Sequence, residues 1–394
     1  MKHSISSRQK VLIGIPCLLT GGTEIHTLHL VSALIAAGYQ VVVCCYFEYE
    51  SEMKKKMEDA GARVILLELK RNRRGKNYFK LIVLARALHR VFKEVQPYFF
   101  HVQYLAPGAF PVIWGKLHRL PRVLATLHTP GHMYKKTTFS IKFIASHVCD
   151  AFFCVSRTAE QHIFGDSSLF SEKAFLAGRR HFHVFNGVDV QRIARLIQEV
   201  DRSELKRRYG LGEGIVIGVT GRLNPVKGHA FLIDVFALLL KTQPNAELLV
   251  IGEGESLPSL QVQAQQLGID EKIRWLGRLL PDDALRAYAV MDVVAVPSVF
   301  EGFGLSAAEA MAAGKPVVAS DVDGLRDIVE QDRTGFLVGY GDKNAMCEAL
   351  ARLGDNRTFR EMLGTAGEKR AMELFGMEQF HRNWQIVYKI LGES

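Results

Sequence analysis

Residues 293 to 319 read Val293-Val-Ala-Val-Pro-Ser-Val-Phe-Glu301-Gly-Phe-Gly-Leu-Ser-Ala-Ala-Glu309-Ala-Met-Ala-Ala-Gly-Lys-Pro-Val-Val-Ala319. Short apolar runs stand at both ends of this stretch, and a glycine-containing loop leads from the first run into an alanine-rich segment. That segment ends at Gly314-Lys-Pro316, which is a typical signal for the end of a helix. A strand, a loop, a helix and a second apolar strand predict a βαβ unit of a parallel sheet that is covered on both faces.

The same alternation runs along the rest of the chain. In the first half the predicted strands are Val11–Ile15, Val41–Tyr46 and Val64–Leu67, and the predicted helices are 23–37, 51–60 and 78–95. From residue 215 the predicted strands are Ile215–Thr220, Glu247–Ile251, Lys272–Trp275, Val293–Val296 and Pro316–Ala319, with helices near 229–241, 257–267, 282–289 and 306–313. A chain of 394 residues is too long for one core, which stops growing at roughly 250–300 residues. We therefore expect an α/β protein with two doubly wound domains, 1–200 and 201–376, joined near 201–214.

Charge is distributed unevenly along the chain. Residues 1–200 carry 28 Lys and Arg against 14 Asp and Glu, whereas the remaining residues carry 22 against 27. Much of the N-terminal excess lies in Lys54-Lys55-Lys56 and in the stretch from Lys70 to Lys76. This excess is either a solvated surface or a surface that attracts anionic lipid headgroups or a phosphorylated acceptor. Nucleic acid is a weaker alternative, because neither an aromatic-interleaved platform nor a zinc module accompanies the charge.

The apolar run Val11–Leu19 is far shorter than the ~20 residues that span a bilayer. It has some features of a signal peptide, but Pro16 lies inside it and Gly21-Gly22-Thr23-Glu24 stands where a small-residue cleavage site would be. A first buried strand and turn is the favoured interpretation. The six cysteines form no CxxC pair, and we expect buried, reduced thiols in a cytoplasmic protein.

Two glycine-containing loops follow predicted strands. Gly21 and Gly22 precede a helix, so the backbone can approach a ligand closely and free N–H groups can face an anion. The GxGxxG spacing of dinucleotide-binding loops is absent, and a turn without a ligand remains an alternative. In the second loop Arg222 and Lys227 follow the strand that ends at Thr220. Two cations there suit a diphosphate, although two surface cations that bracket a turn would look the same.

The opening stretch contains two carboxylates that differ in their surroundings. Glu301 lies in the glycine-containing loop, where an acid can accept hydrogen bonds from hydroxyl groups. Glu309 lies on the helix predicted to begin at Ser306, and Ser306-Ala-Ala-Glu309 fits a capping box that needs no ligand. His128 ends another apolar run, but a lone histidine is usually packed or exposed without a function, and its neighbours His118 and His132 form no metal set.

Taken together, these loops resemble the retaining glycosyltransferases of the GT-B class known as family 4 or glycosyl transferases group 1. The resemblance covers nearly the whole chain and is strongest from Gly218 to Val338. The matching motifs are Glu301-x7-Glu309, Gly221-Arg222, Lys227-Gly228, Asn186-Gly-Val-Asp189, Thr126-Leu-His128-Thr129 and Gly21-Gly22.

The resemblance implies two Rossmann-like domains facing across a cleft, with the last helix, 377–394, packed back on the N-terminal domain. It also implies a nucleoside-diphosphate sugar donor, such as a UDP- or GDP-sugar, and no metal. Arg222 and Lys227 would neutralise the departing diphosphate, Glu309 would bind the ribose and Glu301 the donor sugar. His128 would close the cleft from the N-terminal side. Further ligand-binding positions implied by the resemblance are Gly21, Gly22, Asn186, Ser298, Gly302, Phe303, Gly304 and Leu305.

The implied acceptor is a glycan or a polyprenyl-linked glycan, as in the synthesis of cell-surface polysaccharide, lipopolysaccharide or glycolipid, at the inner face of the cytoplasmic membrane. Two alternatives stay open: a GT-B sugar-nucleotide epimerase, and an inactive scaffold on a membrane surface. The segment Asp323-Gly-Leu-Arg-Asp327 departs from the family pattern, which more often has paired glycines and a glutamate. This departure leaves the nucleotide base and the sugar undetermined.

Overall fold

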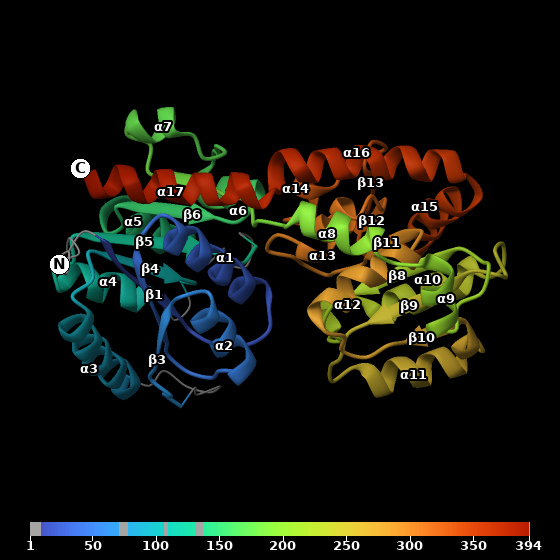
Figure 1. Ribbon diagram of the computed structural model, residues 1–394, viewed down its shortest axis with the longest axis horizontal. Coiled ribbons are helices and arrows are strands. Elements are labelled where there is room, and N and C mark those ends of the chain that lie inside the picture. Colours follow the sequence, from blue (N-terminus) through green and yellow to red (C-terminus); the bar gives the residue numbers. More distant parts are fainter. Residues whose placement is uncertain (1–8, 71–77, 106–108, 131–136, 394) are drawn as a thin grey trace. The chain divides into compact units, whose positions relative to one another are not determined.

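The structure is a computed structural model that describes residues 9–70, 78–105, 109–130 and 137–393 (Figure 1). The chain divides into two compact units. The N-terminal unit comprises Met1–Gly187 together with Glu378–Ser394, and the C-terminal unit comprises Val188–Met377. Each unit has one parallel sheet with helices, so the predicted fold class is confirmed.

The sheet of the N-terminal unit has the strand order β3-β2-β1-β4-β5-β6-β7, and all of its pairs are parallel. The chain order reverses between β1 and β4, as in dinucleotide-binding folds, and ligands bind such sheets at the carboxyl ends of the strands. The strands are β1 (Lys10–Ile15), β2 (Gln40–Cys45), β3 (Arg63–Leu66), β4 (Phe99–Gln103), β5 (Arg122–Leu127), β6 (Ala151–Cys154) and β7 (His181–His183).

Helices cover both faces of this sheet, because right-handed crossovers in opposite directions place their helices on opposite sides. The helices are α1 (Gly22–Ala36), α2 (Ser51–Asp59), α3 (Tyr78–Val95), α4 (Ala109–Leu117), α5 (Thr138–His147), α6 (Arg157–Phe164), α7 (Glu172–Leu176) and the C-terminal α17 (Met377–Glu393). The last of these lies over the sheet beside α1: Trp384 packs on Phe153, and Tyr388 bonds His101 of β4 at 2.8 Å.

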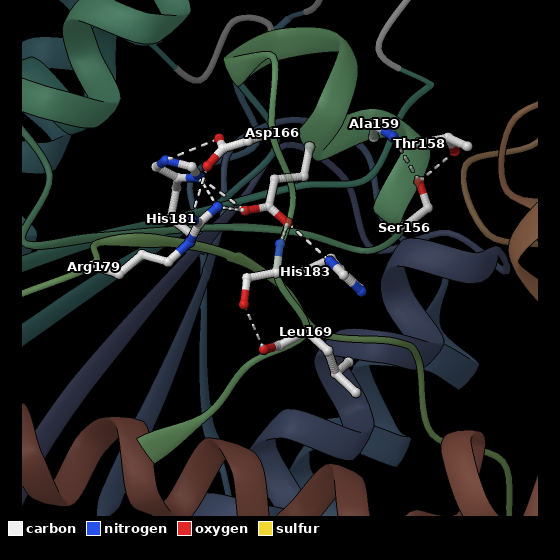
Figure 2. Close-up of polar contacts among 10 residues, drawn as sticks. Ser156, Thr158, Ala159, Asp166, Leu169, Arg179, His181 and His183 are labelled. Atoms are coloured by element: carbon white, nitrogen blue, oxygen red, sulfur yellow. Dashed lines mark hydrogen bonds and ion pairs between the residues drawn. The ribbon is translucent and has the colours of Figure 1, made fainter. Parts of the chain in front are cut away.

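Glu160 on α6 holds the edge strand β7 through its carboxylate, which is fully buried. Its two oxygens lie 2.8 Å from Nδ1 of His181 and 2.8 Å from Nδ1 of His183, and Arg179 lies 3.1 Å away. Figure 2 shows the side chains of His181, His183 and Arg179 together with Asp166, which pairs with Arg179. Such a buried charge is tolerated because each oxygen accepts hydrogen bonds.

The C-terminal unit has a second parallel sheet, with the order β10-β9-β8-β11-β12-β13. Its strands are β8 (Val216–Thr220), β9 (Glu247–Ile251), β10 (Ile273–Trp275), β11 (Val293–Val296), β12 (Val317–Ser320) and β13 (Gly335–Val338). Its helices are α8 (Val190–Gln198), α9 (Arg202–Arg208), α10 (His229–Leu239), α11 (Leu257–Gln266), α12 (Pro281–Arg286), α13 (Leu305–Ala312), α14 (Leu325–Ile328), α15 (Lys343–Asp355) and α16 (Arg357–Phe375). Buried aliphatic side chains from β8, β9 and β11 and from α10 and α15 form its core.

The units divide after Gly187, earlier than the join expected near residue 200. The amphipathic helix α8 explains the difference, because it packs against α12 and α13 and therefore belongs to the C-terminal core. The cysteines are all free, but Cys149 and Cys347 are only partly buried. Among the described helices, none combines the length and the apolar character that a membrane crossing requires. The basic run 71–76 and His132 lie outside the described residues.

Candidate functional site

In the C-terminal unit the loops that follow β8, β9 and β11 are packed against one another. The loop after β8 is bonded to the loop after β9 through Leu223 N and Glu253 O (2.8 Å), and to the loop after β11 through Val299 N and Val226 O (2.8 Å). Gly228 adopts a left-handed φ of 70°, and a Cβ there would lie 1.9 Å from the carbonyl oxygen of Pro297. This glycine is therefore required for the close approach of the two loops.

The close approach brings three predicted residues together. Nζ of Lys227 lies 2.5 Å from Oε1 of Glu301, and the hydroxyl of Ser298 donates to the same oxygen at 2.9 Å. The Lys227 side chain is 30% exposed and that of Glu301 is 11% exposed, so both can still reach a ligand. Arg222 lies in the same loop as Lys227, two residues after β8, and is exposed. One hydrogen-bond acceptor and two cations thus stand at the carboxyl ends of β8 and β11.

The capping box, which was the alternative explanation of Glu309, is excluded. Helix α13 begins at Leu305, one residue earlier than expected, and its N-cap is Gly304, which makes no side-chain capping bond. Gly304 starts the helix with a φ of 106°, a conformation that L side chains rarely adopt. Ser306 is consequently inside the helix, where it cannot act as the N-cap for Glu309.

The Glu309 carboxylate instead faces the side chain of Tyr288. Oε2 of Glu309 accepts a long hydrogen bond of 3.4 Å from the Tyr288 hydroxyl, which also lies 3.1 Å from Oγ1 of Thr220 at the end of β8. Desolvation raises the pKa of Glu309 to about 7, and the Tyr288 hydrogen bond opposes that shift. A carboxylate with one weak donor among the described residues retains capacity to accept hydrogen bonds from ligand hydroxyls.

Two other residues of the Gly302–Leu305 segment have packing roles. The Phe303 side chain is buried and packs edge-to-face on Phe375, with ring centroids 5.5 Å apart. A Cβ at Gly304 would lie 2.6 Å from Cδ2 of Leu325. A ligand in this loop can therefore reach the backbone of Phe303 more readily than its ring.

In the N-terminal unit His128 stands directly after β5, and its Nε2 lies 2.7 Å from Oε1 of Gln103 at the end of β4. An amide oxygen only accepts hydrogen bonds, so Nε2 of His128 carries the proton and Nδ1 is the acceptor of the ring. Desolvation, with smaller effects from His26 and His101, lowers the pKa of His128 well below its usual value. The imidazole is therefore neutral and can accept a hydrogen bond from a hydroxyl group.

His26, on α1, connects the other N-terminal candidates. Its Nδ1 lies 2.8 Å from Oδ1 of Asn186, and its ring packs edge-to-face on His128 with centroids 4.7 Å apart. Gly21 is the N-cap of the same helix and Gly22 is its first residue. His26, about one turn after Gly22, thus brings α1 into contact with both His128 and Asn186. The Asn186 oxygen is engaged by His26, while Nε2 of His26 has no partner among the described residues.

Sequence reasoning did not identify Gln103, His26 or Tyr288. Gln103 has a detectable signal, because it is a polar residue at the end of a strand-like run, as His128 is. In the register of β4 and β5 it pairs with Thr126, two residues before His128. His26 and Tyr288 lie within helical segments and give no such signal.

Two family models match the sequence. Residues 20–168 match the model described as Glycosyltransferase Family 4, and residues 201–370 match Glycosyl transferases group 1. An uncharacterized glycosyltransferase of Methanocaldococcus jannaschii is 31% identical over 212 residues, 53% of this chain and 54% of that protein. The D-inositol 3-phosphate glycosyltransferase of Corynebacterium glutamicum is 36% identical over 173 residues, 42% of this chain and 41% of that protein. The matched stretches thus span about half the length of these curated relatives.

Solved structures resemble the chain over almost its entire length. Anabaena HepE in complex with UDP aligns with a TM-score of 0.78 and 19% identity, covering 97% of this chain and 99% of that one. Sucrose-phosphate synthase from Thermosynechococcus elongatus aligns with a TM-score of 0.76 and 22% identity over the same shares. At these identities the likeness concerns the fold, and the family is shown by the sequence models. The two family models match the two halves of the chain, and the two parallel sheets match the fold of the solved relatives. The chain therefore belongs to the group 1 glycosyltransferases of the GT-B fold.

Proposed function

We propose that the protein transfers a sugar from a nucleoside-diphosphate sugar to a hydroxyl group of a glycan or lipid-linked acceptor, with retention of the anomeric configuration. The observation that carries the proposal is the contact between Lys227 and Glu301 beside Arg222, at the carboxyl ends of two neighbouring strands. It supplies cations for a diphosphate and a carboxylate for sugar hydroxyls at one end of one sheet.

In this proposal the C-terminal unit binds the donor. The diphosphate takes Lys227 away from Glu301, because two phosphates carry more negative charge than one carboxylate. Arg222 binds the same diphosphate. The released Glu301, still held by Ser298, accepts hydrogen bonds from the donor sugar, and Glu309 accepts them from the ribose. The cations stabilise the charge that develops on the leaving group, and the proposal includes no metal.

The chemical step exchanges two bonds at the anomeric carbon. The bond from this carbon to the diphosphate oxygen breaks, and the acceptor oxygen forms a new bond on the same face of the sugar. The hydroxyl proton of the acceptor moves to the departing phosphate, so the step needs no protein base. Neutral His128, held by Gln103, accepts a hydrogen bond from a sugar hydroxyl and fixes its orientation.

The acceptor and its location are part of the proposal. The excess of Lys and Arg in residues 1–200 favours an anionic acceptor, such as a polyprenyl-phosphate-linked glycan, at the cytoplasmic face of a membrane. One family member that resembles this chain is named for an inositol phosphate acceptor, which is also anionic. Polysaccharide or glycolipid synthesis would use such acceptors.

A thermal-shift screen with UDP-, GDP- and ADP-sugars tests donor binding. A ligand at 100 times its Kd stabilises the folded state by about 2.7 kcal/mol, a readily measured shift. UDP-glucose is the first candidate, because Anabaena HepE is solved with UDP-glucose. Release of the nucleoside diphosphate is then measured with and without glycan acceptors. Acceptor-dependent release supports transfer, and absence of stabilisation by every sugar nucleotide contradicts the proposal.

A further inference from the structure

Helix α3 of the N-terminal unit has apolar side chains on two faces. One face, with Leu84, Leu88 and Phe92, is buried in the core of the unit. The other begins with Leu81 and Ile82, which are both exposed. A surface helix normally presents polar residues on its outer face, so this second apolar face requires an explanation.

The second face borders a hollow between α3 and α4 of about 500 Å³. Ile82 and Ala85 line it from α3, and Phe110 and Trp114 line it from α4. The two aromatic rings are stacked with centroids 5.7 Å apart, and the indole N–H donates to the Ala85 carbonyl at 3.1 Å. The aromatic wall is therefore fixed in place and offers no unsatisfied indole donor to a ligand.

Two arginines stand at the same hollow. Arg86 and Arg90 lie one helical turn apart on α3, line the hollow and are exposed. The third basic side chain there, His89, is occupied by a contact of 2.9 Å with His118. Within the described part of the chain no carboxylate forms an ion pair with either arginine. A hollow with apolar walls and two guanidinium groups at its edge is complementary to an amphiphile with an anionic head.

The apolar surface continues across the neighbouring helices. Helix α4 contacts both α3 and α5, and it exposes Ile113 and Leu117. On α5, Phe139 is 83% exposed and Phe143 is also exposed. Among the described side chains of the three helices are five Lys and Arg, of which Lys116 pairs with Asp150, and a single acidic residue, Glu94, which pairs with Arg63. The outer side of this helix layer, which we call the α3–α5 face, is thus both apolar and cationic.

We propose that the α3–α5 face docks on an anionic lipid bilayer, with an acyl chain in the hollow and the lipid phosphate on Arg86 and Arg90. This inference rests on the proposed function, because a lipid-linked acceptor requires the enzyme to work at a membrane. Bulky apolar side chains that project beside long cationic ones are the pattern of a surface that lies in a lipid headgroup region. A nucleic acid would match the charge but not the exposed Phe139, Leu117 and Ile82.

The basic triplet Lys54-Lys55-Lys56 is a weaker candidate than the sequence indicated. On α2, Lys54 pairs with Glu58 at 2.8 Å and Lys56 with Glu52 at 2.7 Å. With Asp59 included, this helix carries three acidic and three basic side chains. Its net charge is zero, so it attracts an anionic surface less than the α3–α5 face does. Lys55 is exposed and serves as a matched control position.

Co-sedimentation of the full chain with vesicles tests the proposal. Vesicles of phosphatidylcholine alone are compared with vesicles that also contain about a third phosphatidylglycerol. We expect binding to the anionic vesicles only, and weaker binding as salt is raised. Substitution of both arginines, Arg86→Gln with Arg90→Gln, should weaken this binding by about 10- to 30-fold, since each cation near such a surface contributes about 1 kcal/mol.

Replacement of exposed apolar groups, Ile82→Ser with Phe139→Ser, should also weaken vesicle binding, whereas Lys55→Gln should not. These positions are exposed, so the unfolding temperature should change little. Equal binding to both vesicle types, or unchanged binding by the double arginine variant, would overturn the proposal. If the protein binds neither type of vesicle, a lipid bilayer is excluded as the partner of the α3–α5 face. A protein partner then becomes the better candidate. Donor binding by thermal shift is measured on the same proteins, so a failure of the proposed function is recognised separately.

Discussion

Nζ of Lys227 and Oε1 of Glu301 are 2.5 Å apart although 74 residues separate them in the sequence. Each side chain holds the other in place at the carboxyl ends of β8 and β11. The ammonium group of Lys227 and the carboxylate of Glu301 are therefore positioned before any ligand arrives. Because neither charge lacks a partner, the resting site avoids the cost of a poorly solvated lone charge. In the proposed function the pair separates when the diphosphate of the donor binds Lys227, and Glu301 then accepts hydrogen bonds from the sugar.

Lys227→Ala should lower turnover by on the order of 10²–10³, the scale for losing one group that stabilises charge in the transition state. The measurement is the initial rate of nucleoside diphosphate release at saturating donor and acceptor. Lys241→Ala, at an exposed lysine of the same unit, is the control and should keep the wild-type rate. Near-normal turnover of Lys227→Ala would refute the diphosphate role.

Donor affinity should depend on pH through Glu309. The pKa of Glu309 is about 7, so the ionised form, which we propose accepts the ribose hydroxyls, is lost as the pH falls through that value. The donor Kd should therefore rise by about tenfold between pH 8 and pH 6. The ester-linked phosphates of a sugar nucleotide stay ionised over this range. Titration calorimetry at several pH values measures the effect.

Glu309→Gln separates ligand binding from a structural role. The variant should bind the donor about 10- to 100-fold more weakly, with no pH dependence near 7, because it loses charged hydrogen bonds. A raised carboxyl pKa means that ionisation costs stability as the pH rises through about 7. The variant should therefore unfold at the same temperature as the wild type, or higher, at pH 8. Lower stability with unchanged donor affinity would exclude Glu309 from ribose binding.

Gln103 should act as a positioning residue for His128. Gln103→Leu removes the acceptor of the Nε2 proton, so the imidazole loses its fixed tautomer. Turnover should fall by about tenfold, the equivalent of one hydrogen bond of 1–1.5 kcal/mol. Nitrogen-15 NMR of histidine-labelled protein should show the His128 tautomer changing. Gln198→Leu, on the surface of α8, is the control, and an unchanged His128 spectrum in Gln103→Leu would refute the role.

The predicted strands and helices agree with the structure to within one or two residues where apolar runs are continuous, as in Val293–Val296. Strands β4, β6, β7 and β13 were not predicted, and in β4 His101 interrupts the apolar run. His101 is tolerated there since Tyr388, 287 residues away, and Thr126 satisfy its two nitrogens. Local pattern cannot reveal a partner so distant in sequence.

The candidate site shows the same limit. The motifs gave Lys227 and Glu301 as members of one site, because both follow strands of one predicted sheet, but their direct contact depends on the glycine at 228. The pattern Ser306-x-x-Glu309 does not form a capping box, because the helix begins one residue before Ser306, with Gly304 at a positive φ as its N-cap. Tyr288 lies in a short 3₁₀ helix, Ala287–Val290, where nothing in the pattern indicates a partner for Glu309.

The stability of the N-terminal unit in acid should depend on the Glu160 network. Burial raises the pKa of Glu160, but hydrogen bonds from His181, His183 and the Ser168 N–H outweigh that effect and lower it to about 2. A depressed carboxyl pKa contributes stability above about pH 4.5 that is lost as the pH falls toward 2. At pH 7 this contribution is about 3 kcal/mol, at 1.36 kcal/mol per pKa unit.

Glu160→Gln should therefore lower the unfolding temperature of the N-terminal unit by roughly 6–12 °C at pH 7, at 2–4 °C per kcal/mol for a unit of this size. The difference from the wild type should shrink below pH 4, because the wild-type carboxylate is then losing its charge advantage. Asp166→Asn is the matched control in the same network: its side chain is 58% exposed and its ion pair with Arg179 should contribute less than about 1 kcal/mol. Scanning calorimetry from pH 3 to pH 7 measures both variants. A pH-independent loss in Glu160→Gln would mean that packing, and not the charge, is what Glu160 contributes to the edge strand β7.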